Sequence, residues 1–447
     1  MTGGAMTRRG ALFGAAALLG GCDTLSDWFG ERRERFPGER RSILDIPERS
    51  LRADTAAQGA AVALPPSVPR ADWPVAGGDA PHSGGHIAFG PGLARTWSAG
   101  FGSGNAYRRR LLAGPVVAGG TVYVSDALGA VSAFDVATGN RRWRRDTDRT
   151  NDDDGTMGSG LAVSGETLFV ATGLSELLAF NVADGSVRWR VDLPAPARGA
   201  PAVAGGTVFV PTVSSTLVAL SAEDGARKWT HRAAPNPTLP LGLGTPAVDG
   251  EVVVAGFPSG ELIALRANDG RVLWTESLAA AGGGALSDIA SVRARPAVAN
   301  GRVVAVGMGG LTICVDLRSG RRLWEQESGG PVGAWMAGDW VFLANDAGQV
   351  AALERESGQV RWATSLRAAP EDGKPPPRIE LSSPILAGGR LLVGTSASEL
   401  VSLDPTNGEV SARLPLPSGL TLQPVVAGGL LLASTDDATL LALSGGG

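Results

Sequence analysis

The chain has 447 residues, of which 43% are hydrophobic and 19% charged, and its formal net charge is −4. This apolar content is enough for a large core and excludes a wholly disordered chain. The slightly acidic balance argues against general nucleic-acid binding, which needs a basic face. Glycine accounts for 64 residues and aromatic residues for only 5%, a composition that favours many short strands joined by tight turns.

The N-terminus has the features of a bacterial export signal. Arg8 and Arg9 precede a short apolar stretch, residues 11–21, which ends in Leu-Gly-Gly before Cys22. Small residues before a cysteine at this depth resemble a lipobox, in which the cysteine becomes the lipidated first residue. We therefore expect residues 1–22 to be a lipoprotein signal peptide and Cys22 to bear a lipid that anchors the protein without spanning the membrane. The alternatives are an ordinary secretory signal with a chance cysteine and, because Asp23 resembles an inner-membrane retention signal, the inner rather than the outer membrane.

Residues 23–92 are expected to form a tether outside the core. Residues 31–41 mix arginine with glutamate, and residues 64–69 read Leu-Pro-Pro-Ser-Val-Pro, a stiff extended spacer. Such a segment would hold a folded domain away from the membrane. The arginines could instead contact anionic lipid, but the interleaved glutamates favour a solvated segment.

One sequence unit recurs through residues 93–447. Its first full copy starts at Pro115, has Gly119-Gly120 and Thr138-Gly139 turns between short β-branched or alternating runs, and ends at Trp143. These turns separate four predicted strands. Successive tryptophans of the repeat are 38 to 50 residues apart, a period typical of four-stranded propeller blades. The units begin at Pro115, Gly160, Pro201, Pro246, Pro296, Pro331, Pro384 and Pro424.

The repeat predicts an all-β protein, an eight-bladed β-propeller of four-stranded blades. The seventh unit has Ala412 in place of its tryptophan, and the eighth ends before its fourth strand. Residues 93–98 resemble a fourth strand, and Trp97 precedes Trp143 by the usual spacing, so we expect this N-terminal strand to close the ring. The recurring tryptophans are expected to pack between neighbouring blades. They are Trp97, Trp143, Trp189, Trp229, Trp274, Trp324 and Trp362.

The pattern Ala-Phe-Asp-x-x-Thr-Gly-x-x-x-Trp at residues 133–143 resembles the pyrroloquinoline-quinone-type propeller repeat. Residues 73–82, with Trp-Pro, Gly-Gly-Asp and His82, resemble the segment that often precedes such a propeller. Together with the lipobox, these features resemble the BamB family, the lipoprotein subunit of the outer-membrane β-barrel assembly machinery. The resemblance implies a non-catalytic scaffold at the periplasmic face of the outer membrane. It would dock on the periplasmic POTRA domains of the barrel-forming assembly subunit and aid folding and insertion of β-barrel proteins, with unfolded outer-membrane proteins as further candidate partners.

Two stretches resemble the partner-binding loops of that family. The first, residues 195–201, keeps Arg198 and Gly199 but has alanine at the two positions where the family has leucine, Ala195 and Ala197. The second keeps three residues of the motif and has Ala290 where the family has aspartate. The three residues kept are Leu286, Ser287 and Asp288. By resemblance these loops contact a POTRA domain, and the departures predict a weakened or rebuilt contact. The alternative is that Arg198 and Asp288 pair with each other or with solvent, where an ion pair contributes only about 0–1 kcal/mol.

The sequence offers little for catalysis, so we expect no enzyme activity, no cofactor and no metal site. A quinone-dependent dehydrogenase would need a general base, a calcium site and cofactor-stacking groups. The family of such enzymes often has an adjacent cysteine pair, whereas the two cysteines here, Cys22 and Cys314, are far apart. The acidic stretch 146–154 lacks the closing glutamate of an EF-hand, and the three histidines show no catalytic or metal-binding spacing. A generic periplasmic propeller that binds other proteins or glycans is the remaining alternative.

Overall fold

The computed structural model describes residues 50–54, 62–107, 109–147, 158–236, 241–278, 291–368 and 377–446. These residues belong to one compact unit, residues 49–447. The predicted signal peptide with Cys22 lies outside the described residues, as does the second predicted partner loop with Leu286, Ser287 and Asp288. Among the residues described, no helix is long and apolar enough to cross a membrane.

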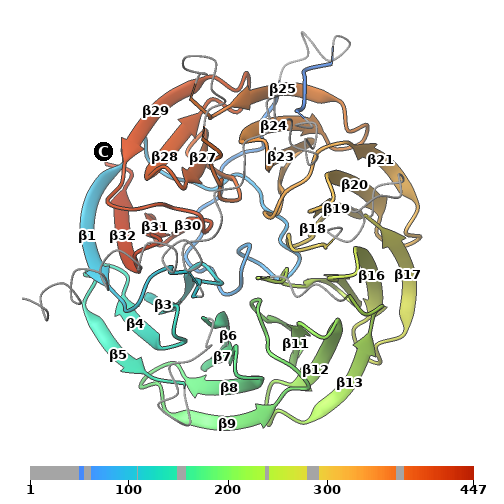
Figure 1. Cartoon of the computed structure of the whole chain (residues 1–447). Helices are drawn as coiled ribbons and strands as arrows, with labels where there is room; N and C mark the ends of the chain where they lie inside the picture. The colour runs from blue at the N-terminus through green and yellow to red at the C-terminus, as the bar shows by residue number, and fades with distance from the viewer. Residues whose placement is uncertain are drawn as a thin grey trace, which may run out of the picture. The chain divides into compact units, whose positions relative to one another are not determined.

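The described residues form eight four-stranded antiparallel sheets, arranged as blades around a central axis (Figure 1). The first four blades are β2–β5 (Val116–Ala118, Thr121–Ser125, Val131–Asp135, Arg141–Arg145), β6–β9 (Gly160–Ser164, Thr167–Ala171, Glu176–Asn181, Val187–Asp192), β10–β13 (Ala202–Ala204, Thr207–Thr212, Thr216–Ser221, Arg227–Arg232) and β14–β17 (Ala247–Asp249, Val252–Gly256, Glu261–Arg266, Val272–Ser277). The next three are β18–β21 (Ala297–Ala299, Arg302–Gly307, Leu311–Asp316, Arg322–Gln326), β22–β25 (Trp335–Ala337, Trp340–Ala344, Gln349–Glu354, Val360–Ser365) and β26–β29 (Ile385–Ala387, Arg390–Thr395, Glu399–Leu403, Val410–Pro415). The eighth contains β30–β32 (Val425–Ala427, Leu430–Ser434, Thr439–Ser444) and β1 (Ala94–Gly100). The predicted all-β, eight-bladed architecture is confirmed.

The first blade shows how the repeat produces its strands. Ala118 of β2 pairs with Thr121 of β3, so Gly119 and Gly120 form a two-residue turn, with φ angles of 55° and 69°. Glycine adopts such positive angles without the steric cost of a side chain. All of β3 is buried, whereas Trp143 is the only buried residue of the outer strand β5. The inner strands of the blade are therefore covered on both faces, and the outer strand is largely exposed.

β1 closes the ring as the fourth strand of the eighth blade. It runs antiparallel to β32, with Trp97 opposite Ala442 and Gly100 opposite Thr439. The predicted closure by an N-terminal strand is therefore confirmed. Pairing the first strand with the last gives the eighth blade its full set of four strands and leaves β32 without a free edge, which would otherwise favour aggregation.

The repeat tryptophans lie at the boundaries between blades. The indole Nε1 of Trp97 donates a hydrogen bond to the carbonyl of Val136 at 2.9 Å, and a Cβ added at Gly139 would lie only 2.6 Å from the same ring. The Thr-Gly turn of one blade thus leaves room for the tryptophan of the previous blade. Equivalent ring-on-glycine pairs are Trp143–Gly185, Trp189–Gly225, Trp229–Gly270, Trp274–Gly320, Trp324–Gly358 and Trp362–Gly408.

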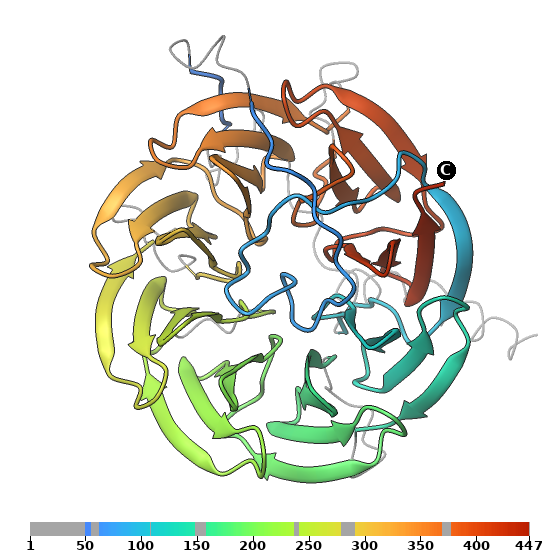
Figure 2. The same ribbon diagram turned by 180° about the vertical axis from the view of Figure 1, so that it is seen from behind.

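Residues 62–92 do not lie outside the core, and the predicted tether is wrong for this part. Figure 2 shows the segment, in blue, running around the inner edge of the ring. Trp73 and Ile87 are only 1% and 2% exposed. Backbone groups of the segment form hydrogen bonds with seven of the eight blades. The blade residues are Val117 in β2, Val163 in β6, Val248 in β14, Val298 in β18, Met336 in β22, Leu386 in β26 and Gly428 after β30.

The physical reason is that the innermost strand of each blade has a free edge facing the axis. Buried backbone N–H and C=O groups need partners, and the central segment supplies them at these edges. Its proline-rich and glycine-rich composition is typical of a linker, but the same residues suit a chain that turns repeatedly inside a narrow ring. Residues 50–54 also pack on the propeller, since Leu51 and Asp54 form hydrogen bonds with Gln349 and Val360 of the sixth blade.

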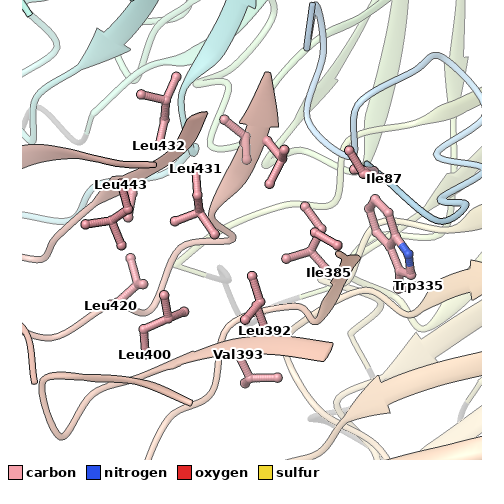
Figure 3. Close-up of a cluster of buried hydrophobic side chains, with 14 of the residues drawn as sticks. Ile87, Trp335, Ile385, Leu392, Val393, Leu400, Leu420, Leu431, Leu432 and Leu443 are labelled. Atoms are coloured by element: carbon pink, nitrogen blue, oxygen red, sulfur yellow. The ribbon is translucent and has the colours of Figure 1, made fainter. Parts of the chain in front are cut away.

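The sixth blade is adapted to this central segment. Trp335, which stands where the other blades have alanine, valine or isoleucine, is 1% exposed, and its Nε1 donates to the carbonyl of Gly85 at 2.8 Å. Figure 3 shows Trp335 beside Ile87, next to leucines of the seventh and eighth blades. Trp335 therefore belongs to the shared core of the segment and the blades.

Candidate functional site

A cavity of about 430 Å³ lies at the centre of the ring. Trp73, Ala76 and Gly77 of the central segment line one part of it. The other lining residues come mainly from the connections that lead from the outer strand of one blade to the inner strand of the next, among them residues 110–115, 241–245 and 331–333. The cavity is thus built from the same connections in which the sequence places its partner-binding loops.

The first predicted partner loop joins β9 to β10. Its backbone is held on several sides: the amide of Leu243 donates to the carbonyl of Arg198 at 2.8 Å, and the amide of Ala197 donates to Thr172 at 3.1 Å. Gly199 has no room for a side chain, because an added Cβ would lie 2.5 Å from the carbonyl oxygen of Leu243. Arg198 itself is half-buried. The loop therefore presents Arg198 from a fixed backbone.

One of the two alanines that replace the family's leucines in this loop packs inside the propeller. Ala197 is fully buried in a cluster with Phe169, Val208 and Leu220. Ala195 is half-buried. The Ala197 side chain thus packs inside the propeller, and only the remainder of the loop is available to a partner.

Four arginines that were not among the predicted site residues line the cavity: Arg110, Arg293, Arg295 and Arg378. Burial lowers the pKa of Arg295 to about 10, and burial with the charge of Arg110 lowers the pKa of Arg293 against the opposing charge of Glu380. A signal for them exists in the sequence, because Arg293 and Arg295 alternate with the buried Val292 and Ala294 just before the fifth blade. Such alternation places both arginines on one side of an extended chain.

The three histidines and Cys314 are packed against, or hydrogen-bonded to, other parts of the propeller. His82 is 2% exposed, and its Nδ1 donates to the carbonyl of Pro296 at 2.7 Å. His86 bonds to Pro65 and Gly389, and His231 packs edge-on against Phe257. Burial raises the pKa of the Cys314 thiol to about 12. In the part of the chain that the structure describes, no three His, Cys, Asp or Glu side chains are placed to hold a metal ion.

The predicted acidic stretch is only partly visible. Asp146 is exposed, with a carboxylate oxygen 3.9 Å from Nη2 of Arg144, and residues 148–154 lie outside the described residues. Arg144 also pairs with the buried Asp126 at 3.2 Å. Asp126 accepts hydrogen bonds from the amides of Leu128 and Ala130, so this charge group braces the β3–β4 turn.

The closed ring, the eight blades and the recurring Asp…Thr-Gly…Trp motif define a propeller of pyrroloquinoline-quinone-type repeats. The profile of the family described as outer membrane protein assembly factor BamB matches residues 94–154, 128–364 and 371–446. The chain therefore belongs to this family, as the sequence resemblance predicted.

Individual curated relatives can be aligned with only part of this chain. Proteins named outer membrane protein assembly factor BamB from Salmonella typhimurium and Escherichia coli are each 29% identical, over 157 and 166 residues. These matches cover 35% and 37% of this chain, and 38% and 40% of the relatives. Less than half of either relative is thus aligned.

Solved structures show the same fold. BamB from Moraxella catarrhalis matches with a TM-score of 0.67 and 21% identity, covering 79% of this chain and 99% of that one. A quinohemoprotein alcohol dehydrogenase from Comamonas testosteroni matches with a TM-score of 0.66 and 16% identity, covering 84% and 81%. The propeller is therefore shared by an assembly factor and by an enzyme, and fold alone does not separate their functions.

Proposed function

We propose that this protein is a non-catalytic scaffold lipoprotein of outer-membrane protein assembly. The match of the family profile to most of residues 94–446 is the observation that supports this most directly. A lipid on Cys22 would hold the propeller at the periplasmic face of the outer membrane. Fractionation of inner and outer membranes tests this location, since Asp23 makes the inner membrane the alternative.

The partner in this proposal is the barrel-forming assembly subunit, bound through its POTRA domains. Arg198 is suited to such a contact, because its backbone is fixed by Leu243 and Gly199 and its guanidinium offers a planar fork for carboxylates or carbonyls. Arginine is also enriched among interface residues whose truncation costs about 2 kcal/mol or more. Leu286, Ser287 and Asp288 would supply the second part of the surface.

Unfolded outer-membrane proteins are the second proposed partner. An extended client segment could add to the outer edge of a blade, since β29 exposes most of its residues. Crosslinking of purified propeller to an unfolded barrel protein tests this step. If no crosslink forms, the client role is withdrawn and the docking role stands.

The docking role is tested by a native pull-down of the lipidated protein from detergent-solubilised envelopes, read by mass spectrometry. The wild type is expected to recover the barrel-forming subunit, and Arg198→Glu and Asp288→Arg are expected to lose it. Arg271→Glu, at an exposed hairpin of the fourth blade, is the matched control and should behave as wild type. If both variants still recover the barrel-forming subunit, the contact must lie at other residues. No recovery by the wild type would favour the generic propeller scaffold instead.

A further inference from the structure

The central cavity is more basic than the protein as a whole. Its lining includes the four arginines named above and two acidic residues, Asp346 and Glu380, although the whole chain has a net charge of −4. Arg110 and Arg378 are exposed, whereas Arg293 and Arg295 are mostly buried. An acidic protein thus gathers an excess of positive charge around its axis.

Arg295 is the strongest element of this cluster. Its Nη2 donates to Oε1 of Gln423 at 2.6 Å, and its Nε has no hydrogen-bond acceptor among the described residues. Gln423 is itself buried, and its amide nitrogen donates to the carbonyl of Pro384 at 2.9 Å. A carbonyl can only accept, so this bond fixes the amide with its oxygen toward Arg295.

No carboxylate neutralises Arg295 within the described residues. The pKa of its guanidinium is lowered by burial alone, and the residues that face the side chain are Gln423, His82, Gly77 and Gly333. A buried charge without a counter-charge costs several kcal/mol relative to a compensated one. The Arg295 guanidinium is therefore placed to receive a counter-charge from a molecule outside the chain.

The wall is shaped around the two buried arginines. A Cβ added at Gly242 would lie 2.9 Å from Nε of Arg293, and one added at Gly77 would lie 2.9 Å from Nε of Arg295. Glycine at these positions lets both side chains lie flat against the backbone. The guanidinium groups are therefore held in place before any ligand arrives, which lowers the entropy cost of binding.

We propose that the central cavity binds a small organic anion through Arg293 and Arg295, with carboxylate or phosphate oxygens as the recognised groups. Arginine pairs with both through paired N–H donors. A volume of about 430 Å³ suits a small molecule, and Leu111, Leu243 and Leu422 give the wall apolar surface for its carbon skeleton. Anion binding does not depend on the proposed docking of a POTRA domain, so either proposal can fail without the other.

The test uses the purified full-length protein and titration calorimetry at constant ionic strength, without added calcium. Citrate represents polycarboxylates, inorganic phosphate represents phosphates, and glycerol is the neutral control. Saturable one-to-one binding of citrate or phosphate, with none of glycerol, is expected. Whichever anion binds more tightly identifies the preferred group. Absence of saturable binding by both anions would overturn the proposal.

Two variants locate the binding. Arg295→Met keeps the side-chain volume and removes an uncompensated charge, a change that folded proteins usually tolerate. It should weaken anion binding at least about tenfold, as should Arg293→Gln, because hydrogen bonds to charged groups are worth about 1.5–3 kcal/mol. Arg271→Gln, at an exposed arginine that does not line the cavity, should bind as wild type. Equal binding by wild type and both cavity variants would show that the anion binds elsewhere and would refute the assignment.

Discussion

The indole rings of Trp73 and Trp335 stack with centroids 6.0 Å apart and planes within 6° of parallel. One ring belongs to the central segment and the other to the inner strand of the sixth blade. Arg70 lies over the Trp73 ring at 5.2 Å. This pair holds the central segment, which lines the cavity, against the sixth blade. It therefore links the stability of the propeller to the shape of the cavity.

Trp73→Ala is expected to destabilise the whole propeller by about 3–5 kcal/mol, the usual cost of removing a buried aromatic side chain. It should also expose the central segment to proteolysis. Thermal unfolding and limited trypsin digestion measure the two effects. Val68→Ala, at a residue of the same segment that is 63% exposed, is the control and should change neither. Similar results for both variants would mean that the segment is not held by its core contacts.

The packing of repeat tryptophans on glycines can be separated from backbone strain. Gly139 and Gly119 both have positive φ, 72° and 55°, but only Gly139 has a neighbouring ring in the way of a Cβ. Gly139→Ala should therefore destabilise the protein by about 1–3 kcal/mol more than Gly119→Ala, because overpacking adds to the shared strain. Melting temperatures of the two variants test this. Equal losses would contradict a packing role for the Trp97 contact.

The hydrogen bonds of the tryptophans can be tested in the same way. Trp274 Nε1 donates to the carbonyl of Leu317 at 2.7 Å, whereas Trp189 Nε1 is buried with no partner in the described part of the chain. Trp274→Phe leaves a buried carbonyl unpaired and should cost about 1–2 kcal/mol more than Trp189→Phe. Urea unfolding followed by circular dichroism compares them. A larger loss for Trp189→Phe would refute the assigned bond.

Stability should fall with acid partly because of His82. Burial first, then the charge of Arg295, lowers the pKa of His82 to about 4, against the opposing hydrogen bond to Pro296 and charge of Asp79. Between about pH 6.5 and 4 the unfolded chain binds more protons than the folded one at this site, so this contribution is present above pH 6.5 and decreases as the pH falls. At pH 5 the loss is about 2 kcal/mol relative to pH 7.5.

His82→Asn tests this dependence. Asparagine tolerates the positive φ of residue 82, 56°, and lacks a titrating group. The difference in unfolding free energy between pH 7.5 and pH 5 should shrink by about 2 kcal/mol in the variant. An unchanged difference would show that His82 is not responsible and that the carboxylates dominate the acid response.

The amino-acid sequence by itself determined the blade number, the position of the turns and the closing strand. Each follows from local rules: glycine pairs mark two-residue turns, and the Thr-Gly…Trp spacing repeats because every blade packs on the next in the same way. The strand that contains Trp97 could be recognised as the fourth strand of the last blade because Trp97 precedes Trp143 by this spacing. The Arg198 loop could be located only through a family motif, because nothing in its local pattern distinguishes it from the other connections.

Tertiary structure alone decided what occupies the centre of the ring. Residues 62–92 have the composition of a linker, and their backbone groups find partners on seven blades only when the inner strand edges come together as the ring forms. The cavity arginines are likewise scattered from Arg110 to Arg378 in the sequence. Sequence periodicity reports contacts between residues that are near one another in the chain. The propeller axis instead brings together residues from blades that are far apart in the sequence. The residues that line the cavity can therefore be identified only from the closed ring.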